Sequence, residues 1–234
     1  MTTFSESDSF WKGGNTLKVP MELFQLNRQR LCEALRSHPT LPSDSIVLLQ
    51  GGASEMRHSS DHEPVFRQES YFHWTFGVIE PDFYGAINIE NGESTLFIPR
   101  LPASYVAWMG KIKEPEEFKQ IYHVDHVFYV DELESVFERI VGKAKLILVL
   151  NGLNTDSGSE AKAAHFEGID KFHVDKTTLY SIINECRVLK TDFELDVLRY
   201  TNKISSEAHK FVMLNIKDGK RKTNFFSNLN RIFS

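Results

Sequence analysis

Short apolar runs alternate with amphipathic stretches along the chain, and this pattern predicts an α/β protein. Ile46–Leu49 and Leu146–Leu150 are continuous apolar runs, which are typical of strands buried on both faces of a sheet. Tyr84–Ile89 and Thr95–Ile98 flank Asn91-Gly92, and this arrangement predicts a β-hairpin with a type I′ turn. A hairpin among buried strands indicates a mixed β-sheet flanked by helices.

Apolar residues at helical spacing predict the flanking helices. Pro20 is expected at the first position of a helix, and Phe24, Leu31 and Leu35 then mark its buried face. Further helices are expected over residues 115–122, 131–140, 178–188 and 191–216.

Two of these helix starts carry capping residues. Asp131 is expected to cap the helix that contains Leu133 and Phe137. Thr191 and Glu194 have the spacing of a capping box, in which each side chain bonds the other residue's backbone N–H. The loop between 151 and 158 is rich in Asn and Gly and is expected to lack regular structure.

The composition is that of an ordinary globular protein. The 234 residues are 41% hydrophobic and 25% charged, which excludes disorder over most of the length. No apolar run approaches the ~20 residues that a membrane-spanning helix needs, and the first residues do not resemble a secretory signal. Cys32 and Cys186 lie far apart without C-x-x-C spacing, which argues against a disulfide scaffold or zinc knuckle and favours a cytoplasmic location.

The net charge of −5 is unevenly distributed. Segment 217–234 carries five basic residues and one acidic residue, so the rest of the chain is more acidic than the total indicates. An acidic globular body gives no electrostatic reason to expect nucleic acid as a partner. The basic tail also has an apolar stripe from Phe225 to Phe233, which would suit an anionic membrane surface, although a tail without any partner is the favoured interpretation.

Two histidine pairs have spacings that could serve metal binding. His58 and His62 are four residues apart, but the surrounding Ser, Asp and Pro predict a loop rather than a helix. His123 and His126 are better explained as part of a connection between a helix and a strand. We therefore expect no metal-binding residue in this chain.

Trp108 is the most informative aromatic residue. Trp74 lies in an aromatic run and is expected in the core, whereas Trp108 follows a strand within a proline-containing segment. A large aromatic residue in such a loop either covers its own domain's core or contacts a partner, and the residues alone do not decide between these roles.

Several stretches of the chain resemble a known family. The matching words include Thr16–Pro20, Asn27–Glu33, Phe66–Ser70, Phe72–Trp74, Phe76-Gly77, Ser94–Phe97, Pro99–Ser104, Trp108–Ile112, Asn154–Gly158, Glu185–Val188 and Leu198–His209. Over about residues 10–216 the chain is similar to the N-terminal part of the eukaryotic Xaa-Pro dipeptidases (prolidases), relatives of creatinase and aminopeptidase P. The resemblance is specific, because long matching segments occur in the same order along the chain.

The resemblance implies a domain organisation. Residues 1–184 would form an α/β domain of the creatinase/aminopeptidase P N-terminal type, a mixed sheet flanked by helices. Residues 185–217 would begin a pita-bread catalytic domain with its first long helix, and 218–234 would be a divergent tail. Because the match fades after Gly219, the chain is expected to be truncated relative to the family.

The resemblance also implies a chemistry that this chain does not carry. In the family, two Asp, one His and two Glu hold two manganese ions, and the enzyme releases proline from X-Pro dipeptides as a homodimer. All of those ligands follow the point where the match fades, so none is assigned here. We expect no catalytic residue, no bound manganese and no activity from this chain alone.

Two roles are therefore expected for the chain. It is either the N-terminal portion of a manganese-dependent Xaa-Pro dipeptidase, or a non-catalytic dimerisation module that pairs with a full-length subunit. A membrane-surface binder that acts through its tail is a third, weaker alternative. The resemblance implies that Trp108 reaches the active-site mouth of a partner subunit, and an X-Pro dipeptide is expected as ligand only in a complete enzyme.

Overall fold

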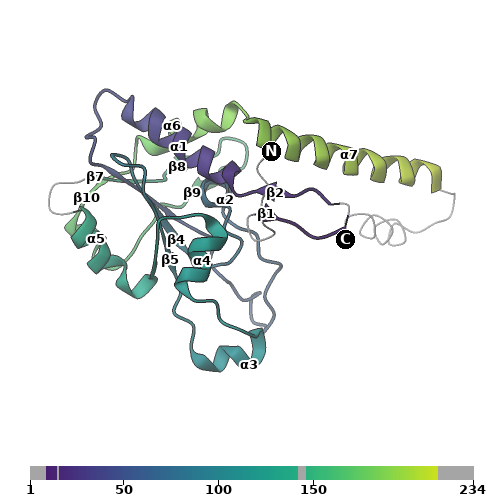
Figure 1. Cartoon of the computed structure of the whole chain (residues 1–234), viewed down its shortest axis with the longest axis horizontal. Helices are drawn as coiled ribbons and strands as arrows, with labels where there is room; N and C mark the ends of the chain where they lie inside the picture. Colours follow the sequence, from purple (N-terminus) through teal and green to yellow (C-terminus); the bar gives the residue numbers. More distant parts are fainter. Residues whose placement is uncertain (1–8, 15, 142–145, 216–234) are drawn as a thin grey trace. The chain divides into compact units, whose positions relative to one another are not determined.

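The computed structural model describes residues 9–14, 16–141 and 146–215. These residues fall into two compact units (Figure 1), which are described separately. Of the described residues, the first unit holds Ser9 and Pro20–Leu189, and the second holds those of Phe10–Val19 and of Lys190–Asn215.

A six-stranded mixed sheet forms the centre of the first unit. Its strands, in spatial order, are β10 (His173–Asp175), β7 (Leu146–Val149), β3 (Ile46–Gln50), β4 (Tyr84–Asn88), β5 (Ser94–Ile98) and β6 (His126–Tyr129). The β4 strand pairs antiparallel with both neighbours, and the other pairings are parallel. The fold class predicted from the sequence, α/β with a mixed sheet, is confirmed.

The helices of the first unit flank this sheet. They are α1 (Glu22–Arg36), α2 (Ser70–Phe76), α4 (Pro115–Tyr122), α5 (Leu133–Val141) and α6 (Leu179–Val188), whereas the short α3 (Val106–Met109) lies in the loop after β5 and away from the sheet. Helix α1 lies beside α2 and α6. Three short 3₁₀ turns cover Ala103–Tyr105, Val130–Glu132 and Ile169–Lys171, and two short strands, β8 (Gly152–Leu153) and β9 (Glu160–Ala161), pair with each other.

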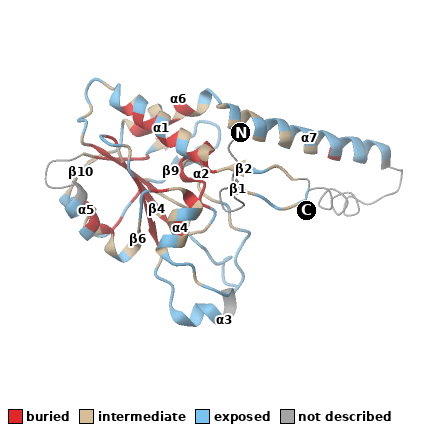
Figure 2. Ribbon diagram, viewed as in Figure 1, coloured by how far each residue is buried: buried red, intermediate tan, exposed pale blue. Residues whose placement is uncertain are grey.

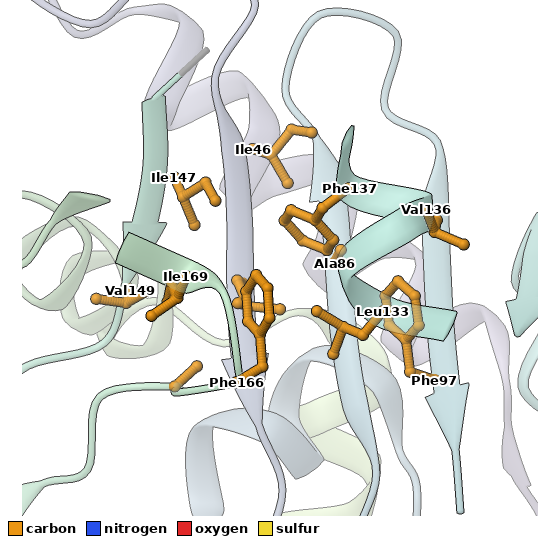
Figure 3. Packing of buried hydrophobic residues seen from close by; sticks show 12 residues of the cluster. Ile46, Ala86, Phe97, Leu133, Val136, Phe137, Ile147, Val149, Phe166 and Ile169 are labelled. Carbon is orange, nitrogen blue, oxygen red and sulfur yellow. The ribbon is translucent and has the colours of Figure 1, made fainter. Parts of the chain in front are cut away.

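One hydrophobic cluster of the core lies where α5 packs on one face of the sheet. Leu133, Val136 and Phe137 of α5 lie against Phe97 and Ile147 of the strands (Figure 3). Alternate strand residues such as Val47 and Leu49 are also buried, so β3 is covered on both faces. This two-sided burial explains why its sequence reads as a continuous apolar run.

The second unit contains the long helix α7 (Asp192–Asn215). A separate two-stranded sheet pairs β1 (Ser9–Phe10) with β2 (Val19–Pro20). The predicted capping box is present: the Thr191 N–H donates to Glu194 Oε2 at 2.8 Å, and the Glu194 N–H donates to Thr191 Oγ1 at 3.2 Å. Most of α7 is exposed, with Ala208 as a buried exception (Figure 2). Among the described residues, no helix has the length and apolarity that crossing a bilayer requires.

Two local predictions about helix starts are wrong. Pro20 belongs to β2, and α1 begins two residues later with Met21 as its N-cap, because the fixed φ of proline suits an extended segment as well as a helix. Asp131 lies inside a 3₁₀ turn and pairs with Arg100 instead of capping a helix. The capping contact there comes from Glu132, whose side chain accepts the Tyr129 N–H at 2.9 Å.

Two loop predictions also need correction. The β4–β5 hairpin exists, but its loop is not a type I′ turn, because only Gly92 has a positive φ, of 82°. The longer connection closes through the Gly92 N–H, which donates to Asn88 O at 2.8 Å, and Asn91 Oδ1 accepts the Glu93 N–H at 2.9 Å. The expected loop after β7 contains β8, since a short antiparallel pairing satisfies its backbone.

Candidate functional site

Five of the six strands point the same way, so their carboxyl ends meet at one edge of the sheet. We call this the carboxyl edge; it receives the loops after β3 (51–69) and β5 (99–114) and the turn after β6. In open α/β sheets, ligands and partners are bound by the loops at this edge. The carboxyl edge is therefore the first candidate for a functional site.

The loop after β3 starts with a tight approach of two backbone segments. The Gly51 N–H donates to Phe83 O at 2.8 Å, and the Gly52 N–H donates to Gln68 Oε1 at 2.6 Å. A Cβ on Gly51 would lie 3.0 Å from both acceptor oxygens, so this position has little room for a side chain. Beside it, a shallow cavity of about 250 Å³ opens between Asp82 and Pro99.

The loop after β5, the 99–114 loop, extends from the sheet and carries α3 (Figure 1). Its first residues are held by Arg100, whose Nε donates to Asp131 Oδ2 at 2.8 Å while the guanidinium lies 3.6 Å from the Tyr129 ring centroid. Its last residues are held by an ion pair between Lys113 and Glu80, at 3.2 Å. The loop is thus anchored near both ends, and residues 101–107, 110 and 111 between these anchors are exposed.

The Glu80 carboxylate also connects the loop to α4. The Tyr122 hydroxyl donates to Glu80 Oε2, and the Ile79 N–H donates to the same hydroxyl at 3.4 Å. Burial raises the pKa of Tyr122, and the neighbouring Glu80 raises it further. The phenol therefore stays protonated and acts as a hydrogen-bond donor that supports the loop.

The tip of the 99–114 loop presents apolar groups to solvent. Leu101, Tyr105 and Val106 are all exposed. The backbone of Trp108 lies in α3, but its side chain, like that of Met109, is outside the described residues. The predicted contact of Trp108 with a partner subunit therefore stays a prediction.

The histidine pairs do not assemble a metal centre. His58 lies at a turn with φ of 50°, while His123 ends α4 in a left-handed conformation and His126 begins β6, as the sequence predicted for that connection. Within residues 9–14, 16–141 and 146–215, no three His, Cys, Asp or Glu side chains are close enough to hold an ion. These residues do not fit a pair of manganese ions.

Sequence reasoning missed a buried arginine on α1. Asn27 Nδ2 donates to Trp74 O at 3.0 Å, and Arg28 donates from Nη1 to Thr75 O at 3.2 Å and from Nη2 to His123 O at 2.7 Å. The signal was present, because Arg28 falls at a buried-face position of the helix that Phe24 predicts. The two side chains bind backbone carbonyls at the ends of α2 and α4 and so fix these helices to α1.

Burial also raises the thiol pKa of both cysteines, Cys32 and Cys186. It raises the pKa of the Cys32 thiol to about 11 and raises that of Cys186 in the same direction. At pH 8 the thiolate fraction of Cys32 should fall from roughly a fifth in the unfolded chain to about one in a thousand. We expect iodoacetamide to alkylate native Cys32 at least ~100-fold more slowly than the unfolded chain, as measured by mass spectrometry.

The same shift affects stability at high pH. Because the pKa of Cys32 is higher in the folded protein, the protonated thiol contributes to the free energy of unfolding. This contribution is complete below the pKa of the unfolded thiol. It is lost as the pH rises from about 8.5 toward 11. Alkylation of Cys32 at the same rate in native and unfolded protein would contradict this burial.

Comparisons with known proteins agree with this architecture. The family model "Aminopeptidase P, N-terminal domain" matches residues 24–149. Xaa-Pro dipeptidases of Pongo abelii and Homo sapiens are each 57% identical to this chain over 213 residues, which is 91% of this chain and 43% of theirs. The chain thus spans less than half the length of these curated relatives.

Solved structures show the same fold at lower identity. The low-pH form of Escherichia coli aminopeptidase P superposes with a TM-score of 0.72 at 18% identity, over 93% of this chain and 50% of that one. Pseudomonas aeruginosa aminopeptidase PepP also gives a TM-score of 0.72 at 18% identity, over 92% of this chain and 49% of that one.

Proposed function

Because the chain belongs to the family defined by the aminopeptidase P N-terminal domain, we propose that it is the N-terminal portion of a Xaa-Pro dipeptidase-like metallopeptidase. In this role its described residues perform no hydrolysis. They supply the scaffold of a subunit and a loop that contacts a partner subunit near bound substrate. The 57% identity to two Xaa-Pro dipeptidases is the observation that carries this proposal.

The 99–114 loop is the part of the first unit suited to a partner contact. Its two anchors, the Arg100–Asp131 and Lys113–Glu80 ion pairs, limit the freedom of a segment that is exposed between them. A loop that is already restrained loses less conformational entropy when a partner binds. Its exposed Tyr105 and Val106 supply apolar area for such a contact, and an indole at Trp108 would suit the prolyl ring of an X-Pro dipeptide.

The hydrolytic step belongs to residues other than those described. A dinuclear site needs several convergent carboxylate or imidazole ligands, and the described residues do not bring three of them together. No side chain described here is therefore assigned a catalytic role. The second candidate function, an interaction module that pairs with a full-length subunit, is favoured by the same exposed loop.

The activity test uses the purified chain with manganese and Gly-Pro. We expect no release of proline above the buffer control, because no described cluster can generate a metal-bound hydroxide. A human Xaa-Pro dipeptidase, 57% identical to this chain, provides the positive control under the same conditions. Proline release from this chain at micromolar manganese would refute a non-catalytic role.

The pairing test mixes the tagged chain with the same full-length enzyme. We expect co-purification of the two, and at least ~10-fold weaker pairing for Val106→Asp, because a charge would be buried in an apolar contact. Val65→Asp is the matched control, since Val65 is also exposed but lies in the 51–69 loop. The absence of pairing, or equal loss with both variants, would refute the contact through the 99–114 loop.

A further inference from the structure

A polar cavity lies between α1, the β4–β5 hairpin loop and the residues before β6, and it has no part in the proposed function. Its volume is about 300 Å³, at the lower end for small-molecule pockets. Helix α1 contributes Arg28, Gln29 and Arg36. The hairpin loop contributes Asn91, the start of β5 contributes Ser94, and the residue before β6 is Asp125. We call this cavity the arginine pocket.

Arg28 brings a buried positive charge to the arginine pocket. The residue is only 5% exposed, and its described hydrogen bonds go to two backbone carbonyls, Thr75 O and His123 O. No carboxylate oxygen lies within 4.0 Å of its guanidinium in the described part of the chain. Burial lowers the pKa of Arg28 to about 10, although the more distant Asp125 opposes this effect, so the charge is only partly compensated.

Arg36 brings a second positive charge, at an exposed position two helical turns further along α1. Its Nε donates to Ile89 O at 2.6 Å, which orients the guanidinium. Gly92 lies beside this group, since a Cβ at its position would be in van der Waals contact with Arg36 Nη2, at 3.6 Å. Two guanidinium groups therefore line one small polar cavity.

One carboxylate, that of Asp125, lines the arginine pocket and is already hydrogen-bonded to another lining residue. Asp125 Oδ2 accepts the Ser94 N–H at 2.7 Å and the Ser94 hydroxyl at 2.9 Å. Glu33, which does not line the cavity, accepts a hydrogen bond from Gln29 Nε2 at 2.8 Å. With two arginines and one carboxylate in its lining, the arginine pocket has an excess of positive charge.

We propose that the arginine pocket binds a small oxyanion that carries a phosphate group. The planar guanidinium offers paired N–H donors that match phosphate oxygens, and such charge-assisted bonds are strong where water is scarce. A bound anion would neutralise the buried charge of Arg28. The limited volume and polar lining favour inorganic phosphate or a small phosphomonoester over a larger organic ligand.

Thermal unfolding of the whole chain tests this site with inorganic phosphate and, separately, glycerol 3-phosphate. Sodium chloride at equal ionic strength is the reference. At ten times the dissociation constant, the unfolding midpoint should rise by roughly 3–5 °C above that reference. A rise with both ligands identifies a phosphomonoester site, and a rise with phosphate alone identifies inorganic phosphate as the ligand.

Arg36→Gln should weaken phosphate binding at least ~10-fold, because it removes a charged donor without burying a new group. Arg57→Gln is the matched control at an exposed arginine outside the pocket and should bind as the unsubstituted chain does. In ¹H–¹⁵N NMR spectra, phosphate should shift the Gly92 amide signal. The proposal is overturned if phosphate stabilises no more than chloride, if both variants respond like the original chain, or if the Gly92 signal does not move.

Discussion

Replacing Phe97 by alanine is expected to lower the free energy of unfolding by about 3–5 kcal/mol. Phe97 is fully buried on β5, with its ring centroid 5.9 Å from that of Phe137 and 6.2 Å from that of Phe128. The centroid distance to Phe128 places it in a continuous aromatic cluster beneath α5. Alanine would lose the transfer free energy of the ring and leave a cavity that these rigid neighbours cannot fill.

Urea unfolding followed by circular dichroism measures this change. Val65→Ala is the control, because Val65 is 91% exposed and its truncation should change the free energy of unfolding by less than about 0.5 kcal/mol. A loss below about 1 kcal/mol for Phe97→Ala would show that the region beneath α5 is loosely packed.

Gly77→Ala is the second substitution with a large expected effect, a loss of about 2–4 kcal/mol. Gly77 ends α2 with φ of 72°, and its N–H donates to His73 O at 2.8 Å. A Cβ there would lie 2.5 Å from the ring of Phe24, which is itself buried. Backbone strain and steric overlap therefore act together at this position.

Gly158→Ala separates the two effects. Gly158 has a similar φ of 70°, but a Cβ there would meet nothing within 4 Å. This control should lose only about 1–2 kcal/mol from the left-handed backbone. Equal losses for the two variants, measured by urea unfolding, would show that the Phe24 ring moves aside without cost.

Much of the fold follows from local sequence patterns. The apolar runs at Ile46 and Leu146 became central strands, since burial on both faces requires apolar residues at every position. The capping box at Thr191 also formed, because its partners lie three residues apart and need no tertiary contact. These features depend on neighbours in sequence.

Two of the errors have different physical causes. Asp131 could cap a helix by its sequence, but Arg100, 31 residues away, binds its carboxylate instead, and this contact cannot be read from a local window of sequence. Asn91-Gly92 favours a two-residue turn, but the strand pairing ends at Ile87 and Ser94. The longer loop closes through local hydrogen bonds, such as that from the Gly92 N–H to Asn88 O, which compete with the type I′ turn.

The candidate sites also combine residues that the sequence could reveal with contacts that only the structure could show. Arg28 could have been identified from the sequence, because a charged residue on an apolar helix face must find buried partners. The partners themselves, the carbonyls of Thr75 and His123, required the structure. The anchoring of the 99–114 loop by Glu80 likewise depends on contacts that no spacing predicts.

The central place of β3 in the sheet affects how the chain emerges during synthesis. One edge of β3 pairs with β4, which follows within about 40 residues, whereas the other edge pairs with β7, where Ile46 faces Ile147. At typical translation rates of ~5–20 residues per second, the second partner arrives roughly 5–20 s after β3 itself. Throughout that interval a nascent chain presents the open backbone edge of a strand whose first four residues are all apolar, and such an edge is prone to aggregation unless a chaperone covers it.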